Sequence, residues 1–192
     1  GSIKFFLLGV LSASLILYGF SLLYGVTGKL VFSDIANTLI QSDLNQSPVT
    51  LLSAILILAG IGFKISIVPF HSWAPDTYEG APLPVTAYLS VSSKATGFVA
   101  LIILISKVFY DSGQGLGIIL VFISGITMFV GNLSALQQTN PVRLLAYSSI
   151  AQAGFILAPM AVAGITSNYE DGVYASVTSV SYTHLTLPTS QL

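Results

Sequence analysis

The feature that most limits the fold is a series of long apolar runs separated by short polar segments. Five runs, at residues 3–24, 49–68, 85–105, 116–136 and 148–165, have the length of a membrane span or come close to it, since a hydrocarbon core of about 30 Å takes about 20 helical residues. Backbone amides in lipid must be hydrogen-bonded internally, which favours helices. Because only 7% of the residues are charged, the sequence predicts an all-α integral membrane protein.

The polar segments indicate where these spans end. Residues 26–46 mix apolar and polar positions and predict a short helix at the membrane surface. Pro69 is expected to break the second helix, because proline lacks an N–H and clashes with the preceding turn. Residues 137–147 are predicted to form a loop, Pro159 is expected to interrupt the fifth span, and a sixth span is expected to open near residue 173.

The composition and the residue spacing exclude several classes of function. The chain has no cysteine, which excludes thiolate zinc sites and cysteine-ligated iron–sulfur clusters within it. We find no metal-ligand spacing and no pairing of a nucleophile with a base, so no metal site and no catalytic residue are predicted. A net charge of -1 offers no basic surface for nucleic acid.

Two ionisable side chains, Lys64 and Lys94, fall inside predicted spans. A lysine at the bilayer centre costs about 2.5–3.5 kcal/mol on insertion scales. Lys64 is only about 7 Å from the end of its span, so snorkelling of its ammonium to the headgroups stays an alternative. Lys94 is about 15 Å inside and shares a helix face with Ser90 and Ser93. Burial disfavours the charged amine, so both lysines are predicted to relay protons, with the serines as candidate parts of the path.

The connector after Lys64, PFHSWAPDTYEGAPLP at residues 69–84, leaves two interpretations open. Its aromatic residues suit a membrane interface and its two acids can be solvated, which describes an ordinary loop. Alternatively, Pro69 breaks the helix inside the protein next to Lys64, and His71 passes protons onward. Irregular backbone at membrane depth occurs only where protein covers it or where it lines a cavity.

Residues 63–98, FKISIVPFHSWAPDTYEGAPLPVTAYLSVSSKATGF, resemble the subunit N family of the proton-pumping NADH:quinone oxidoreductase, respiratory complex I. The same subunit is called subunit 2 in mitochondria and has a counterpart in the plastid-type enzyme. KFFLLGVLSASLILYGFSLLYGVTG before this stretch and NPVRLLAYSSIAQAGFIL after it resemble the same family, so the likeness covers residues 3–179. The sister subunits L and M have a loop closer to HTWLPDA, which favours subunit N.

The resemblance implies that the chain is a fragment of a subunit with about fourteen helices in two inverted repeats. It places Lys64 on the broken helix and makes Lys94 the central relay, while the glutamate that pairs with Lys64 and a second-repeat lysine lie outside the chain. The subunit is expected to serve a translocase and to bind no cofactor itself, because NADH, FMN, iron–sulfur clusters and quinone belong to other subunits. The expected partners are the antiporter-like subunit M, small membrane subunits, protons and the lipid bilayer, in a bacterial inner membrane.

Residues 1–179 are therefore interpreted as a partial antiporter-like domain. VSYTHLTLPT, at residues 180–189, resembles the in-frame translation of a transposon-based sequencing adapter, so residues 180–192 are predicted to be a non-native tail. Two other functions stay open. One is a stand-alone cation/proton antiporter or a membrane hydrogenase subunit, and the other is a passive scaffold whose lysines snorkel. The Lys and Arg counts of the loops give no orientation, because Lys4 and Arg143 fall on one side and Lys29 and Lys107 on the other.

Overall fold

The computed structural model describes residues 1–109, 114–166 and 169–186, and these residues form helices and turns without strands. The helices are α1 (Ser2–Thr27), α2 (Phe32–Gln41), α3 (Pro48–Ile65), α4 (Trp73–Gly80), α5 (Leu83–Ser90), α6 (Ser92–Lys107), α7 (Gln114–Leu136), α8 (Pro141–Thr166) and α9 (Tyr169–Thr186). Five segments are long and apolar enough to cross a membrane: α1, α3, α5 with α6, α7 from Gly115, and α8. The predicted fold class is confirmed.

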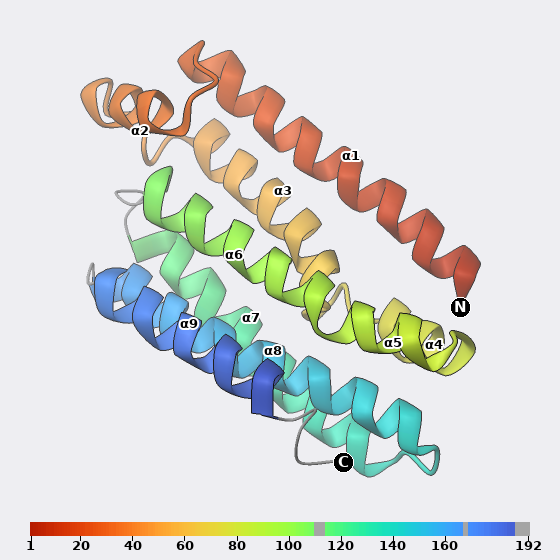
Figure 1. Cartoon of the computed structure of the whole chain (residues 1–192). Coiled ribbons are helices and arrows are strands. Elements are labelled where there is room, and N and C mark those ends of the chain that lie inside the picture. The colour runs from red at the N-terminus through yellow and green to blue at the C-terminus, as the bar shows by residue number, and fades with distance from the viewer. Residues whose placement is uncertain (110–113, 167–168, 187–192) are drawn as a thin grey trace.

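The long helices lie side by side and run in roughly one direction along the molecule (Figure 1). The packed pairs include α1 with α3, α3 with α6, α7 with α8, and α8 with α9. The short helix α2 lies at one end of the bundle, where it buries Ile35 and Leu39, and α4 lies at the other end, against α1 and α8. We call these the α2 end and the α4 end.

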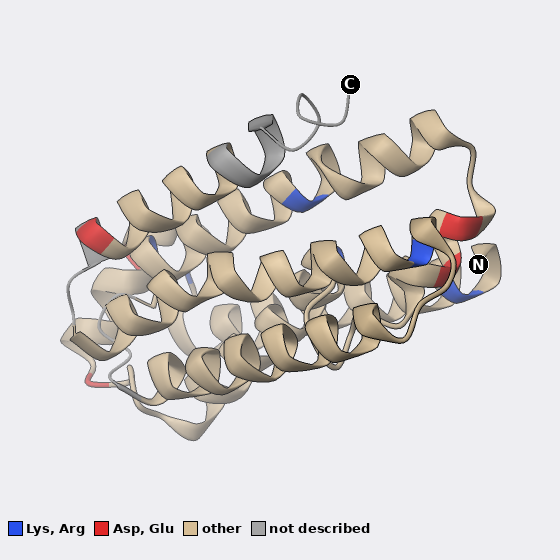
Figure 2. Cartoon of the chain, turned by 90° about the horizontal axis from the view of Figure 1, so that it is seen from below, with Lys and Arg blue, Asp and Glu red and all other residues tan. Residues whose placement is uncertain are grey.

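The charges gather at these two ends, and the tan ribbon between them carries few (Figure 2). Lys4 and Arg143 are both in ion-pair contact with Asp76 at the α4 end. Lys107 ends α6 at the α2 end. Lys4 and Arg143 thus lie at one end and Lys107 at the other, as the sequence predicts.

Helix α3 ends in a Schellman motif at Ser66, three residues before the proline that was expected to break it. Ser66 adopts the left-handed conformation, with φ 60°. The Ile67 N–H donates to Gly62 O over 3.0 Å, and the Ser66 N–H donates to Phe63 O over 3.1 Å, which is the pair of bonds that closes such a cap. Gly62 makes room for this turn, because a Cβ there would lie 3.0 Å from the Ile67 side chain. The broken helix is confirmed, but the span ends at Ile65 rather than at residue 68.

The third span contains an interruption that the hydropathy pattern did not indicate. Helix α5 ends at Ser90 and α6 begins at Ser92, with Val91 between them at φ -107° and ψ -73°. The break falls three residues before Lys94. Two helix ends therefore lie close to the predicted relay lysines, one at Ser66 and one at Val91.

The predicted start of the fifth span was wrong by seven residues. Helix α8 begins at Pro141 rather than at residue 148, because Asn140 accepts a hydrogen bond from the Val142 N–H over 2.9 Å and acts as its cap. Asparagine at the cap followed by proline in the first turn is a strong start signal. Pro159 does not end the helix, which continues to Thr166.

The helix that was expected to open a sixth span, α9, begins at Tyr169 rather than near residue 173 and continues to Thr186. It is not among the segments apolar enough to span a membrane. Residues 187–192 lie outside the described part of the chain, and the interpretation of residues 180–189 as an adapter translation stays a prediction.

Glycines set the closest helix contacts in the bundle. A Cβ on Gly60 would lie 2.7 Å from Ser12 O on α1, and a Cβ on Gly131 would lie 2.7 Å from Ala151 N on α8. Such contacts let helix backbones approach in a membrane, where apolar side chains gain little by leaving lipid. Gly125, also on α7, differs from Gly131, because a Cβ there would meet nothing within 4 Å.

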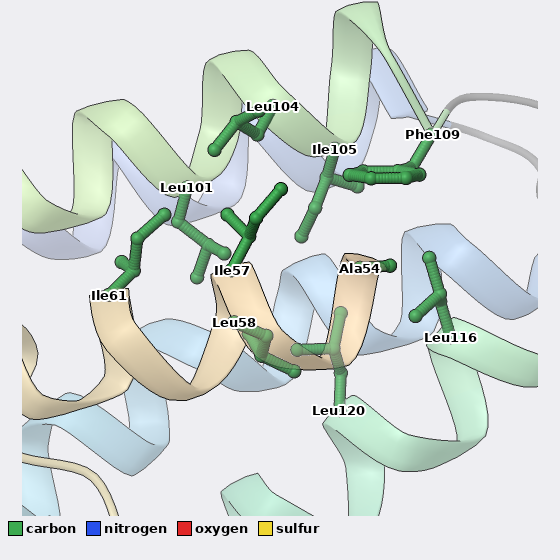
Figure 3. Close-up of a pocket in the computed structure, with 10 residues that line it drawn as sticks. All are labelled: Ala54, Ile57, Leu58, Ile61, Leu101, Leu104, Ile105, Phe109, Leu116 and Leu120. Carbon is green, nitrogen blue, oxygen red and sulfur yellow. The ribbon is translucent and has the colours of Figure 1, made fainter. Parts of the chain in front are cut away.

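A wholly apolar cavity lies among α3, α6 and α7, towards the α2 end of the bundle (Figure 3). Its walls include Ile57 and Ile61 of α3, Leu101 and Leu104 of α6, and Leu120 of α7. These residues belong to the main hydrophobic core of the described chain. The interior directly around this cavity is therefore apolar.

Candidate functional site

Lys94 is buried, with 1% of its surface exposed, and its ammonium has three partners. The Nζ atom donates to Ser149 Oγ over 2.8 Å and to Ser149 O over 3.2 Å, and it lies 5.9 Å from the centroid of the Tyr78 ring. An ammonium has three N–H donors, and an aromatic face at this distance attracts a cation. Two oxygens and one ring thus accommodate the charged form of Lys94 without a carboxylate.

The Ser149 hydroxyl is oriented to accept from Lys94. It donates its own proton to Ala146 O, one turn earlier on α8, over 2.8 Å. A hydroxyl has one donor and two acceptor positions, so the lone pairs of Ser149 Oγ are free for the lysine. Sequence reasoning missed Ser149 as a partner, because it is 55 residues from Lys94 and its helical position gives no signal of the contact.

Lys64 lies next to Lys94 on the neighbouring helix. A Cβ on Gly97, which follows Lys94 by one turn of α6, would lie 3.4 Å from Lys64 Cγ. Lys64 is in the last turn of α3, two residues before the break. Its side chain is exposed, and within residues 1–109, 114–166 and 169–186 no hydrogen bond or ion pair to its ammonium is recorded. The two predicted relay lysines thus lie on neighbouring helices within about one turn of each other, Lys94 enclosed and Lys64 exposed.

The backbone of the break is held by side chains from two helices. The indole N–H of Trp73 donates to Phe63 O over 2.9 Å, and the Val68 N–H donates to Thr127 Oγ1 of α7 over 3.1 Å. Trp73 is also buried against the Phe63 ring, at a centroid distance of 5.2 Å. Buried backbone groups need such partners. The break and the buried side of α4 are therefore held inside the protein, which favours the broken-helix interpretation over the ordinary loop.

The role of Thr127 at the break is testable. Thr127→Val keeps the shape but leaves the Val68 N–H without an acceptor, and we expect the full-length subunit to lose about 1–3 kcal/mol of stability. Thr127→Ser keeps the hydroxyl and is the matched control. The measurement is the thermal midpoint of the purified complex. Equal midpoints for the valine and serine variants would contradict the assignment.

His71 lies in the connector, half-buried, and burial lowers the pKa of its imidazole, so it is neutral at neutral pH. Its Nδ1 makes no hydrogen bond in the described structure, and the same holds for three other buried side-chain atoms: Ser66 Oγ, Thr77 Oγ1 and Tyr78 Oη. All four belong to the segment from the break through α4. No contact of His71 with either lysine is recorded among the described residues, so its part in a proton path stays a prediction.

Ser90 and Ser93 share a side of the third span with Lys94 but do not contact its ammonium in the described structure. Ser90 Oγ donates to Ala87 O on its own helix over 3.0 Å, and both serines are half-buried. The interruption at Val91 separates Ser90 from the helix that carries Lys94. The ammonium contacts Ser149 instead, and a part of Ser90 and Ser93 in a proton path stays a prediction. Within the described residues no group of three or more His, Cys, Asp or Glu side chains is placed to hold a metal ion.

The lysines lie nearer the α4 end than the α2 end. Ser149, which holds Lys94, is about 12 Å along α8 from Pro141, whereas the whole of α8 is about 39 Å long. Between Lys94 and the α4 end lie Tyr78 and the connector, and towards the α2 end lies the apolar cavity. The site is therefore polar on one side and apolar on the other.

The chain resembles known proteins along its whole described length. A family model described as "NADH:quinone oxidoreductase/Mrp antiporter, TM" matches residues 1–187. NADH-quinone oxidoreductase subunit N of Desulfitobacterium hafniense is 46% identical over 169 residues, which are 86% of this chain and 33% of that protein. NAD(P)H-quinone oxidoreductase subunit 2 of Trichormus variabilis is 44% identical over 174 residues, covering 90% and 33%.

A solved structure of respiratory complex I from Thermus thermophilus with bound aureothin contains a chain of similar fold. The TM-score is 0.71 at 38% identity, over 96% of this chain and 38% of that one. The chain spans about a third of the length of the curated relatives it matches. The resemblance seen in residues 63–98 is thus confirmed over most of the sequence, and the chain belongs to the NADH:quinone oxidoreductase/Mrp antiporter transmembrane family.

Proposed function

We propose that this chain is part of subunit N of an NADH:quinone oxidoreductase and carries protons through Lys64 and Lys94. The observation that carries the proposal is the enclosure of Lys94 by Ser149 and Tyr78. The stem of Lys64, at the end of the broken helix, meets α6 one turn away, at Gly97. An intramembrane ionisable residue is costly and marks a functional site by default. The identity of 44–46% to quinone oxidoreductase subunits supports the same interpretation.

In this proposal Lys94 alternates between ammonium and amine. The ammonium is held by Ser149 Oγ, Ser149 O and the Tyr78 ring. No carboxylate contacts it among the described residues, so a change of charge at the neighbouring Lys64 alters its free energy directly. A proton released by Lys94 passes to the next group of the path, and the amine takes up another from the α4 end. The driving energy comes from quinone reduction in other subunits, which hold the NADH, FMN, iron–sulfur clusters and quinone, and this chain holds no cofactor.

The proposed partners are the antiporter-like subunit M and the small membrane subunits of the complex, within a lipid bilayer. The exposed apolar side chains of the outer helices, such as Phe6 and Leu17 of α1 and Phe122 of α7, suit contact with lipid or with such subunits. We place the complex in a bacterial inner membrane. A photosynthetic membrane is the alternative, because the Trichormus variabilis relative is cyanobacterial.

The second candidate is a cation/proton antiporter or a membrane hydrogenase subunit, and the family description itself includes Mrp antiporters. The test is to tag the full-length subunit in its source cell, purify its complex and reconstitute it in liposomes. We expect NADH oxidation with added quinone to acidify or alkalinise the vesicles without any requirement for Na⁺. A preparation that exchanges Na⁺ for H⁺ and oxidises no NADH would instead establish the antiporter.

A further inference from the structure

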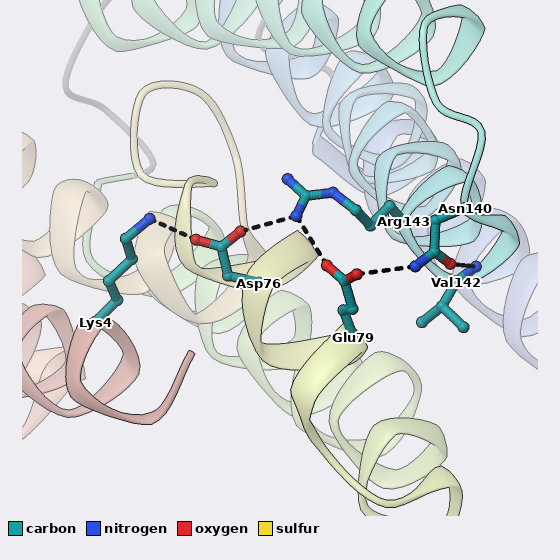
Figure 4. Close-up of polar contacts among 6 residues, drawn as sticks. All are labelled: Lys4, Asp76, Glu79, Asn140, Val142 and Arg143. Carbon is teal, nitrogen blue, oxygen red and sulfur yellow. Dashed lines mark hydrogen bonds and ion pairs between the residues drawn. The ribbon is translucent and has the colours of Figure 1, made fainter.

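A chain of polar contacts joins three helices at the α4 end (Figure 4). Lys4 of α1 pairs with Asp76 of α4. Arg143 of α8 places Nη1 3.3 Å from Asp76 Oδ1 and 2.8 Å from Glu79 Oε2. Asn140, which caps α8, donates from Nδ2 to Glu79 Oε1 over 2.9 Å. We call Glu79, Arg143 and Asn140 the α4–α8 clamp.

The clamp fixes the orientation of α4 as well as its distance from α8. Each oxygen of Glu79 takes a separate donor, one from Arg143 and one from Asn140. Charge-assisted hydrogen bonds of this kind are stronger than neutral ones and define a geometry. Asp76 and Glu79 are three residues apart and so share a face of α4, which is why Arg143 reaches both.

The two helices that the clamp joins form the two sides of the Lys94 site. Tyr78, which places its ring over the ammonium, immediately precedes Glu79 on α4. Ser149, which accepts from the ammonium, lies on α8 six residues after Arg143. Between them, α4 and α8 share one buried cluster that includes Ala74, Tyr78, Ala146 and Ile150. A change in the spacing of α4 and α8 at the clamp therefore changes the spacing of Tyr78 and Ser149.

We propose that the α4–α8 clamp is a positioning device that holds Tyr78 and Ser149 around the Lys94 ammonium and thereby sets the pH range in which the subunit moves protons. The inference rests on the proposed function of Lys94. None of the clamp residues contacts Lys94 itself, so Glu79, Arg143 and Asn140 act through Tyr78 and Ser149.

Other titratable groups near Lys94 could also shift the pH profile of proton pumping. Helix α3 brings Lys64 and α4 brings Tyr78, whereas Tyr88 of α5 is exposed and no contact of it with Lys94 is recorded among the described residues. Helix α8 brings Ser149, and no acid or base of α8 is recorded in contact with Lys94 among the described residues. Helices α2 and α9 also pack on α6. Their charged residues with described side chains, Asp34 and Asp171, lie in the first turn of each helix.

Asp76, which Arg143 also contacts, does not titrate near neutral pH. The hydrogen bond from Lys4, with the charges of Lys4 and Arg143, holds the pKa of Asp76 below its ordinary value. The stabilisation from Asp76 is therefore present at all pH values above its unfolded pKa and is lost only as the pH falls through the lowered folded value. A change in the pH profile near neutrality cannot come from Asp76.

The test uses the full-length subunit in its complex, reconstituted in liposomes. Glu79→Gln removes the charge that holds Arg143, and we expect the pH profile of proton pumping to move by about 0.5 pH unit toward lower pH. The direction follows because a displaced Ser149 accepts less well from the ammonium. Arg143→Met should also shift the pH profile. Arg143→Lys keeps a cation at the clamp and should retain most of the wild-type profile. Lys4→Met removes only the ion pair of Lys4 with Asp76. It is the matched control and should leave the pH profile unchanged.

Assembly is measured for every variant by the amount of intact complex. Where Glu79→Gln lowers it, Asn140→Ser serves instead, because serine still caps α8 but has no amide to donate to Glu79. A pumping rate that falls in proportion to the amount of complex, with an unchanged pH profile, would overturn the positioning role. Lys94→Met separates the two proposals: if it pumps normally, the proposed function fails, and if it does not pump while Glu79→Gln keeps the wild-type profile, only the clamp proposal fails.

Discussion

Lys94→Met in the full-length subunit is expected to lower proton pumping by about a hundredfold or more while the complex still assembles. A positioned group that takes up and releases a proton contributes rate factors of this order. Methionine fills the volume of the lysine stem, so packing against α3 and α8 is kept, but Ser149 Oγ and Ser149 O lose their donor. The measurement is the change in the signal of a pH-sensitive dye in liposomes, divided by the amount of NADH oxidised.

Two further variants show what Lys94 contributes. Lys94→Arg keeps a positive charge that does not dissociate in proteins, so it should also stop pumping if proton release is the function. Lys107→Met, at the exposed end of the same helix, should pump normally. Normal pumping by an assembled Lys94→Met complex would support the passive-scaffold interpretation. If the Lys94→Arg complex pumps and the Lys94→Met complex does not, a fixed positive charge at this position is enough for pumping.

Gly131→Leu is expected to prevent assembly of the subunit. Even a methyl group on Gly131 would lie 2.7 Å from Ala151 N and 2.9 Å from Ala151 Cα. Both atoms belong to the backbone of α8 and cannot move unless the helix does. Overpacking of a close contact costs about 1–3 kcal/mol or more. Ala151 follows Ser149 by two residues, so a displaced α8 also disturbs the Lys94 site.

Gly125→Leu is the matched control for this substitution. Gly125 lies on the same helix, and a Cβ there meets nothing within 4 Å. Both substitutions gain about the same helix propensity, about 1 kcal/mol, so only the contact with α8 differs. The readout is the amount of intact complex on a native gel. Equal assembly of the two variants would show that α7 and α8 are not held together through Gly131.

Hydropathy predicted the number and approximate positions of the spans, because the length of an apolar run is a property of the local sequence. The signal for the start of α8 is also local, because Asn140 and Pro141 form a recognised helix start. The predicted start followed the apolar run at residues 148–165 instead. Ser66 shows a different limit. Glycine or asparagine usually marks a left-handed cap, and serine carries no such signal. The break was therefore predicted at the proline three residues later.

The site was predictable only in part. Lys64 and Lys94 stand out in the sequence because charge is rare in an apolar run. Their partners do not, because Tyr78 and Ser149 come from other helices and nothing in the spacing of a tyrosine or serine shows which side chain it faces. Ser90 and Ser93 were chosen for sharing a helix face with Lys94, yet residues on one face of a helix point to a common neighbour rather than to one another. The polar partner came from that neighbour, α8.

The apolar cavity at the α2 end also has an electrical consequence. A membrane potential of 100 mV is worth about 2.3 kcal/mol for each elementary charge that crosses the whole membrane. If the ends of α8 mark the membrane faces, Lys94 stands about a third of the way across. A proton that reaches Lys94 from the α4 end then does only about 0.8 kcal/mol of the work against such a potential. The remaining two thirds of the voltage falls across the apolar interior around Ile57, Leu101 and Leu120. The apolar side chains around the cavity are thus part of the layer across which a proton leaving Lys94 towards the α2 end does most of its electrical work.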